Sequence, residues 1–224
     1  MRVFTDDQAR TFLSADKHTR HACLFQLALH TGMRQGELLG LMWKDLDWIN
    51  RQIHIQRQLS HVINGSLVFS EPKTAKGRRT IVISPTMVDS LRKHLEEQGS
   101  GKKALGEKWE ENDLIFQSKL GTHLNPVNMF REYQELLRET GLPPIRFHDL
   151  RHTAATLLLQ QGVHPKIVQE RLGHADISMT LNTYSHVLPS MQEDAAEKLD
   201  ELLTPIEVSK EINFLREVEQ LYSA

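Results

Sequence analysis

The chain of 224 residues has a single cysteine, Cys23, and therefore cannot form an internal disulfide. Cys23 lies in the apolar run ACLFQLAL, which favours a small buried residue in a reducing compartment over a catalytic thiol. No apolar run approaches the roughly 20 residues needed to span a bilayer. The first residues, MRVFTDDQARTFL, are interrupted by charges and lack a signal-peptide core. These absences predict a cytoplasmic protein with no membrane partner.

Net charge is also nearly absent, at −2, but it is unevenly distributed. Residues 1–186 carry 24 Lys and Arg against 20 Asp and Glu, whereas residues 187–224 carry 3 against 9. The body is therefore mildly basic and the tail acidic. A basic body permits a polyanionic partner without proving one.

Hydrophobic periodicity predicts a mainly α fold with a small three-stranded antiparallel sheet, an α+β class. Helical patterns fill the chain before Asp47, and one of them ends at Gly32, a favourable residue after a helix. The three predicted strands alternate in hydrophobicity and read RQIHIQRQL, SLVFSEP and RRTIVIS. A basic loop, KTAKG, lies between the last two strands.

After Pro85 the pattern predicts a helix, PTMVDSLRKHLEEQ, a Gly- and Lys-rich loop over 99–106 and a short extended piece, DLIFQS. Further helices are expected at 126–140, 148–161, 165–172, 177–184 and 189–203. A last helix begins at Thr204, where TPIE forms a capping box. We expect one domain over 1–188 and an acidic helical tail over 189–224.

The stretch RFHDLRHTAATLLLQQG places polar residues at the start of an apolar helix. On a helical wheel, His148, Arg151 and His152 share the face opposite the core, which is most simply a solvated face. His148 and His152, with Asp149 between them, also imitate the zinc-binding pattern H-E-x-x-H. The acid is one methylene too short, however, and Arg151 would place a fixed positive charge beside the metal. We therefore rank a phosphate site above a zinc site.

A phosphate site needs further anion-binding groups, and the chain contains them. Arg34 opens a helix in TGMRQGEL, and Glu37 lies one turn later on the same face, although such a pair is usually a weak surface contact. His174 follows a glycine in ERLGHADIS. Tyr184 lies in the polar stretch TLNTYSH, although a packed structural tyrosine is the ordinary alternative.

These motifs, with the basic hairpin PKTAKGRRTIVI, resemble the catalytic domain of the tyrosine recombinases, the phage-integrase family. The resemblance covers residues 1 to about 190, with the motifs in family order. It is closer to integrases of phages and integrative elements than to the resolvases of chromosome dimers. It implies a site-specific recombinase that integrates or excises DNA without a metal or another cofactor.

The resemblance also assigns roles to residues. Tyr184 would attack a DNA phosphodiester to form a 3′-phosphotyrosyl link and release a 5′-hydroxyl. Because a tyrosine of pKa about 10 is only about 0.1% ionised at pH 7, a base must assist, and His148 is the candidate. The other catalytic positions are Arg34, Arg151 and His174 on the phosphate oxygens and Lys73 as the general acid, with Lys76 as the fallback.

Several residues receive secondary roles. Glu37 matches a family position that supports the first arginine. Lys76, Arg78 and Arg79 are expected to contact the DNA backbone. Asp149 and His152 are interpreted as structural neighbours. Tyr133 and Tyr222 lack companion motifs and are not nucleophile candidates.

The family usually carries core-binding and arm-binding domains before the catalytic domain, and we expect both to be absent from this chain. The partner would be double-stranded DNA, bound by a homotetramer of the full-length protein, with the isolated chain a monomer. The acidic tail would either close its own domain or dock on a neighbouring subunit.

Three other functions remain as alternatives. A type IB topoisomerase shares the chemistry but religates the same strand. A zinc hydrolase would use His148 and His152. A DNA-binding regulator with an inactive site is disfavoured, because no expected catalytic position is missing.

Overall fold

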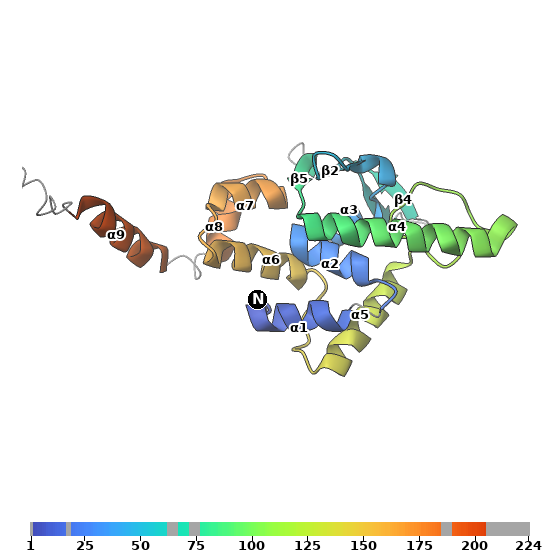
Figure 1. The fold of residues 1–224 in the computed structure, drawn as a ribbon, viewed down its shortest axis with the longest axis horizontal. Coiled ribbons are helices and arrows are strands. Elements are labelled where there is room, and N and C mark those ends of the chain that lie inside the picture. The colour runs from blue at the N-terminus through green and yellow to red at the C-terminus, as the bar shows by residue number, and fades with distance from the viewer. Residues whose placement is uncertain (1, 17–18, 62–66, 72–76, 185–189, 205–224) are drawn as a thin grey trace, which may run out of the picture. The chain divides into compact units, whose positions relative to one another are not determined.

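The computed structural model describes residues 2–16, 19–61, 67–71, 77–184 and 190–204 (Figure 1). The chain forms two compact units, residues 1–187 and 188–224. Helix α9 (Ser190–Leu203) lies in the second unit, and the remaining described elements lie in the first. The predicted helix that starts at Thr204 falls almost entirely outside the described residues.

The prediction of a mainly helical chain is confirmed. Three helices match the predicted bounds to the residue, namely α5 (Pro126–Thr140), α7 (Pro165–Leu172) and α8 (Ile177–Tyr184). The other helices of the first unit are α1 (Asp6–Asp16), α2 (Ala22–Thr31), α3 (Gln35–Leu39), α4 (Pro85–Leu105) and α6 (Asp149–Gln160), with 3-10 turns η1 (Trp43–Asp45) and η3 (Gly106–Lys108). None of the described helices is long and apolar enough to cross a bilayer.

The predicted antiparallel sheet of three strands is confirmed, and a second antiparallel sheet of two strands, which the sequence did not predict, accompanies it. One sheet has the order β1 (Leu46–Asp47), β2 (Gln52–Ile55), β5 (Arg79–Val82), and the other pairs β3 (Gln58–His61) with β4 (Leu67–Ser70). The predicted strand RQIHIQRQL is divided between them. Its break contains Arg57, whose guanidinium pairs with the buried carboxylate of Asp45. The chain therefore leaves one sheet at Ile55 and enters the other at Gln58, with the Arg57 pair between them.

Helix α4 runs through the stretch that was predicted to be a loop over 99–106. Gly99 and Gly101 lie inside the helix, where a glycine costs roughly 1 kcal/mol relative to alanine. Tertiary contacts outweigh this cost, because the Gln98 amide donates to the carbonyls of Leu114 and Ile115. The predicted strand DLIFQS forms only isolated bridges with the rest of the described chain.

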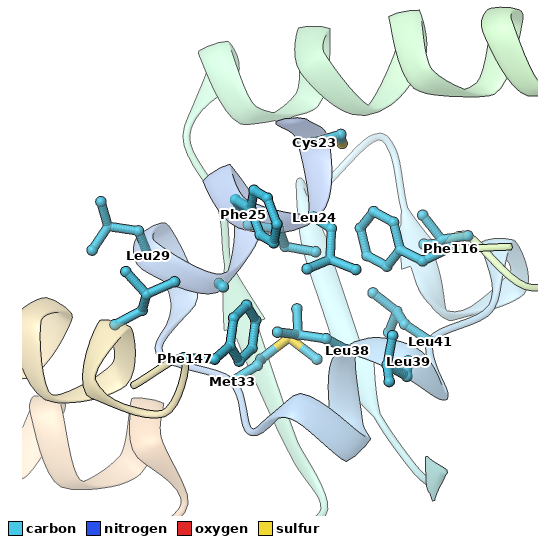
Figure 2. Close-up of a cluster of buried hydrophobic side chains, with 14 of the residues drawn as sticks. Cys23, Leu24, Phe25, Leu29, Met33, Leu38, Leu39, Leu41, Phe116 and Phe147 are labelled. Carbon is cyan, nitrogen blue, oxygen red and sulfur yellow. The ribbon is translucent and has the colours of Figure 1, made fainter. Parts of the chain in front are cut away.

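Helix α2 is the centre of the core and packs against α1, α4 and α6. Its apolar residues Leu24, Phe25 and Leu27 are completely buried. Figure 2 shows part of this cluster, in which Leu24 and Phe25 lie among side chains from α3 and from the segments that contain Phe116 and Phe147. Cys23 is also buried, as predicted.

Four aromatic rings pack together beneath α2. The ring of Tyr133 lies 5.9 Å from Phe12, 5.6 Å from Phe25 and 5.5 Å from Phe147, measured between centroids, in edge-on geometry. Its hydroxyl is buried and has no hydrogen-bond partner within the described part of the chain. Burial also raises the pKa of Tyr133 far above its ordinary value, so the hydroxyl remains protonated.

We expect Tyr133→Phe to raise the free energy of unfolding by about 1 kcal/mol, because it removes a buried polar group without a partner and keeps the ring. Tyr133→Ala, the matched variant that removes the ring, should lower it by about 3–5 kcal/mol. Urea unfolding followed by circular dichroism measures both. A lower free energy of unfolding in Tyr133→Phe would contradict the inference that the Tyr133 hydroxyl is buried at a cost in stability.

Candidate active site

The residues singled out from the sequence come from separate elements of the first unit. Arg34 directly precedes α3, His148 and Arg151 open α6, His174 follows α7, and Tyr184 ends α8. The structure brings several of these residues close enough to interact electrostatically. The charges of Arg34, Arg79, Glu37 and Tyr184 all shift the pKa of Arg151.

The Arg151 guanidinium is buried, with only 3% of the residue exposed. Nη1 donates to the carbonyl oxygen of Gly32 at 2.7 Å, whereas Nη2 has no hydrogen-bond partner among the described residues. Burial, and then the charges of Arg34 and Arg79, lower the pKa of Arg151 to about 9, so it remains cationic at pH 7. The site thus holds a desolvated cation with an unused donor.

The helical-wheel interpretation of this face was wrong. Arg151 was placed opposite the core on a solvated face, yet the residue is 3% exposed, and Ala155, one turn later, is completely buried. A wheel describes one helix, whereas α6 packs against α2 on one side and α7 on another. The polar face of α6 is therefore buried at Arg151, although His148 at its start is exposed.

Gly32 makes the close approach of these elements possible. It ends α2 in the left-handed conformation, with φ 65°, as the sequence predicted for a residue after a helix. A Cβ here would lie 2.6 Å from Cδ2 of Leu172, so a substituted residue would be strained by the positive φ and would also have to displace the Leu172 side chain. Glycine at this position lets α7 pack over the carbonyl that holds Arg151.

Glu37 accepts hydrogen bonds from two arginines. Its Oε1 lies 2.9 Å from Nη1 of Arg34, and its Oε2 accepts the backbone N–H of Arg34, also at 2.9 Å. Arg79 binds both oxygens, with Nη1 to Oε1 at 3.0 Å and Nη2 to Oε2 at 2.9 Å. The carboxylate is thus a bridge between Arg34 and Arg79.

The residues that were predicted to contact DNA differ in their burial and in their partners. Arg79 was expected on the DNA backbone; its side chain is 7% exposed and pairs with Glu37, and its contact with DNA stays a prediction. Arg78 is exposed and pairs with Glu71, which leaves its predicted role open. Lys73 and Lys76 lie outside the described residues, so the choice of general acid stays a prediction.

Tyr184 is completely buried, and its hydroxyl lies 2.8 Å from Nδ1 of His152. Burial raises the pKa of Tyr184 to about 12, with Arg151 acting in the opposite direction. The tyrosine is therefore neutral at pH 7, and its hydroxyl donates a hydrogen bond to Nδ1 in the tautomer of His152 that carries its proton on Nε2. His152 had been interpreted as a structural neighbour, and only the packing of α8 on α6 could identify this contact.

His148 and His152 form a pair of neutral imidazoles. Their ring centroids lie 5.1 Å apart in edge-on geometry, and His148 is exposed. Partial desolvation of the ring, and then the charge of Arg151, lower the pKa of His148. Burial, and then His148, lower the pKa of His152 to about 4. Both rings can accept a proton at pH 7.

His174 is held by a residue that the sequence did not single out. Its Nδ1 lies 2.8 Å from the hydroxyl of Thr180, which is completely buried on α8. Burial and nearby arginines lower the pKa of His174 to about 4. When the Thr180 hydroxyl donates to Nδ1, the ring proton lies on Nε2, which is then a donor for an anion.

The arrangement does not favour the zinc alternative. Asp149 is engaged by Arg146, whose Nη2 lies 2.8 Å from Oδ1. One ring nitrogen of His152 faces Tyr184. No group of three or more His, Cys, Asp or Glu side chains is placed to hold a metal within the described ranges.

The first unit thus holds a desolvated arginine, a second arginine held by a carboxylate, two histidine motifs and a buried tyrosine. Comparison with family models identifies the class, since residues 2–191 match the phage integrase family. The chain belongs to this family, whose members are tyrosine recombinases, and its first unit has the fold of their catalytic domain.

Relatives agree with this assignment. The chain is 35% identical over 211 residues to a tyrosine recombinase XerC-like protein of Caldanaerobacter subterraneus, covering 89% of this chain and 54% of that protein. It is 34% identical to the ICEBs1 integrase of Bacillus subtilis, covering 80% of this chain and 48% of the relative. A Tn1549 transposon integrase solved with circular intermediate DNA is 26% identical, with a TM-score of 0.75 over 88% of this chain and 67% of the other. The chain spans about half the length of these curated relatives.

The lowered histidine pKa values predict a pH-dependent stability. The folded protein keeps His152 and His174 neutral down to about pH 4, whereas the unfolded chain takes up these protons near pH 6.5. The unfolded state therefore binds more protons between these values, and the free energy of unfolding should fall as the pH drops from 6.5 toward 4.

Urea unfolding at pH 7.5, 6.0 and 5.0 measures this dependence. The double variant His152→Gln/His174→Gln should show a shallower decline than the parent, because two of the titrating rings are gone. A decline of equal steepness in the double variant would assign the effect to other groups.

Proposed function

We propose that the chain is the catalytic part of a site-specific DNA recombinase that cleaves and rejoins DNA through a 3′-phosphotyrosyl intermediate, without a metal. One observation carries the proposal: the hydroxyl of Tyr184 bonds to His152, the residue next to the buried Arg151, whose Nη2 has no hydrogen-bond partner among the described residues. A hydroxyl nucleophile beside unneutralised positive charge suits attack on a phosphodiester.

The arginines account for the electrostatic part of the reaction. The attacked phosphate gains negative charge at its non-bridging oxygens as Tyr184 adds to phosphorus. Arg151 offers a free Nη2 to these oxygens, and Arg34 offers the donors that Glu37 does not occupy. In a desolvated site such fixed charges stabilise the transition state more strongly than in water.

Proton transfers complete the balance of the step. The Tyr184 oxygen forms a bond to phosphorus, its proton passes to the histidine pair of His148 and His152, and the bond to the 5′ oxygen breaks. The leaving 5′ oxygen takes a proton from an acid, for which Lys73 is the candidate. In the second half, a 5′-hydroxyl attacks the phosphotyrosyl bond and restores Tyr184.

Access to Tyr184 requires a change in structure. Because the side chain is completely buried, a phosphodiester reaches its hydroxyl only when α8 or a segment next to it moves. Helix α8 has only eight residues and follows the His174 turn, so it is a small element to displace. Cleavage would then depend on DNA binding.

The proposed partner is double-stranded DNA, as in the Tn1549 transposon integrase complex. A mildly basic first unit suits that partner. The chain spans about half of its curated relatives, so the homotetrameric assembly, the docking of residues 189–224 on a neighbouring subunit and a cytoplasmic location belong to this proposal rather than to the structure.

The proposal predicts a covalent protein–DNA adduct that depends on Tyr184. A randomised library of nicked duplexes, in which cleavage near the nick releases a short strand and prevents religation, is incubated with the protein in EDTA. Adducts resistant to SDS are recovered and sequenced. We expect the parent to yield an enriched sequence and Tyr184→Phe to yield no adduct.

Tyr133→Phe is the matched control, because it removes a hydroxyl from a tyrosine outside the site, and it should form the adduct normally. An adduct that persists in Tyr184→Phe would overturn the assignment of the nucleophile. An adduct that forms only with added zinc would favour metal chemistry instead.

The choice between Lys73 and Lys76 can be tested on the enriched site. Loss of the general acid should lower cleavage by about 10²–10⁴-fold on normal DNA, because the 5′ alkoxide leaves unprotonated. A bridging 5′-phosphorothiolate has a good leaving group and should restore the rate. We expect Lys73→Ala to be rescued and Lys76→Ala to lose only DNA affinity, and rescue of Lys76→Ala instead would reverse the assignment.

A further inference from the structure

Glu37 is the most highly coordinated carboxylate of the site. The residue is 1% exposed, and each of its two oxygens accepts one hydrogen bond from Arg34 and one from Arg79. A carboxylate has about four lone-pair positions, so these four bonds use them all. Arg79 supplies half of this coordination.

Arg79 also contacts two other segments of the site. Its Nε donates to the carbonyl of Arg171 at 2.7 Å, and its Nη1 lies 3.2 Å from the carbonyl of Gly77. Gly173, with φ 70°, packs directly on the guanidinium, since a Cβ there would lie 2.8 Å from Nη1. The same side chain thus contacts the turn before His174 and the end of the basic hairpin loop.

Arg79 acts on Glu37 through its positive charge as well as through the geometry of its guanidinium. Burial alone would raise the pKa of Glu37, but the hydrogen bonds and charge of Arg79, followed by those of Arg34, outweigh burial and hold the pKa below its ordinary value. Glu37 therefore stays ionised. Without Arg79 the buried carboxylate would keep one cationic partner and lose two of its four hydrogen bonds, a costly state in a desolvated site.

We propose that Arg79 is a positioning residue for the reaction: its fork fixes Glu37, which holds Arg34 against the phosphate, and its Nε fixes the turn that carries His174. Arg79 does not touch the reacting atoms and does not contact the DNA backbone. The inference rests on the proposed function, because it assigns Arg34 and His174 to the phosphate.

The first test is Arg79→Gln, measured as single-turnover adduct formation on the enriched nicked site. At saturating DNA the rate constant should fall by about 100-fold, the effect expected when catalytic groups shift by about 1 Å. The dissociation constant for DNA should change by less than about threefold, since the side chain is buried. A large loss of affinity for DNA with an unchanged rate constant would show that Arg79 contacts the DNA backbone, and it would overturn the proposal.

Arg79→Lys separates charge from geometry. Lysine keeps the positive charge but cannot form the two parallel hydrogen bonds of the fork. We expect it to restore part of the rate, leaving a loss of about 10-fold. If Arg79→Lys were as slow as Arg79→Gln while both retained the parent Tm, geometry alone would account for the role through Glu37. A parental rate in Arg79→Lys would overturn the geometric part of the proposal.

Arg57→Gln is the matched control for a merely structural contribution. Arg57 also pairs with a buried carboxylate, that of Asp45, which is 1% exposed, but this pair is not among the charges that act on Arg151. Its loss should lower Tm without lowering the rate constant at a temperature where the protein is folded. An equal fall of the rate constant in Arg57→Gln would assign the effect of Arg79→Gln to general destabilisation.

A double-mutant cycle tests the route of action. If Arg79 acts mainly through Glu37, Arg79→Gln should cost less than about threefold in a Glu37→Gln background, because the carboxylate it holds is gone. A full 100-fold loss in that background would show that Arg79 acts elsewhere and would overturn the bridge through Glu37.

A readout independent of cleavage separates this inference from the proposed function. Side-chain NMR of the chain reports how fast the Arg34 guanidinium rotates. Rotation should be slow in the parent and in Arg57→Gln and should become fast in Arg79→Gln. If the parent forms no adduct, the proposed function fails, and this measurement still decides whether Arg79 positions Arg34. Unchanged rotation in Arg79→Gln would overturn the proposal.

Discussion

The site depends on one constraint: the Arg151 guanidinium is held away from water, and its Nη2 has no hydrogen-bond partner in the part of the chain that the structure describes. Its carbonyl contact with Gly32 neutralises no charge, and two further arginines act on it against a single carboxylate, Glu37. The fold therefore stores an excess of positive charge at this point, a costly state. An oxyanion entering the site would lower that cost, so the anion affinity follows from the folded structure itself.

Such a state persists only because rigid packing surrounds it. Most residues of helix α2 are buried in the core, and Gly32, which caps the helix, supplies the carbonyl that orients Arg151. The aromatic cluster beneath α2 includes Phe147, directly before the HxxR motif, so core packing fixes the start of α6. A guanidinium placed by such packing needs little reorganisation when charge develops, which is the main source of electrostatic catalysis.

Local sequence signals predicted the helices and most residues of the site, because caps and motifs act over a few positions. They could not distinguish Arg78 from Arg79. Arg79 begins β5 whereas Arg78 lies just before it, and the partner that draws Arg79 inward, Glu37, is 42 residues away. His152 was missed for the same reason, since its contact with Tyr184 forms only when α8 packs on α6. The two-sheet arrangement and the extension of α4 likewise depend on distant side chains.

The burial of Tyr184 affects the nucleophile in two ways. It raises the pKa of the hydroxyl to about 12, so free tyrosinate is rarer than in water, and it separates the nucleophile from solvent. An incoming phosphate adds negative charge and disfavours tyrosinate further. Attack through preformed tyrosinate is therefore the least favourable route. Transfer of the proton to a neutral histidine during attack avoids that species, and the lowered pKa of both His148 and His152 keeps such an acceptor available at neutral pH.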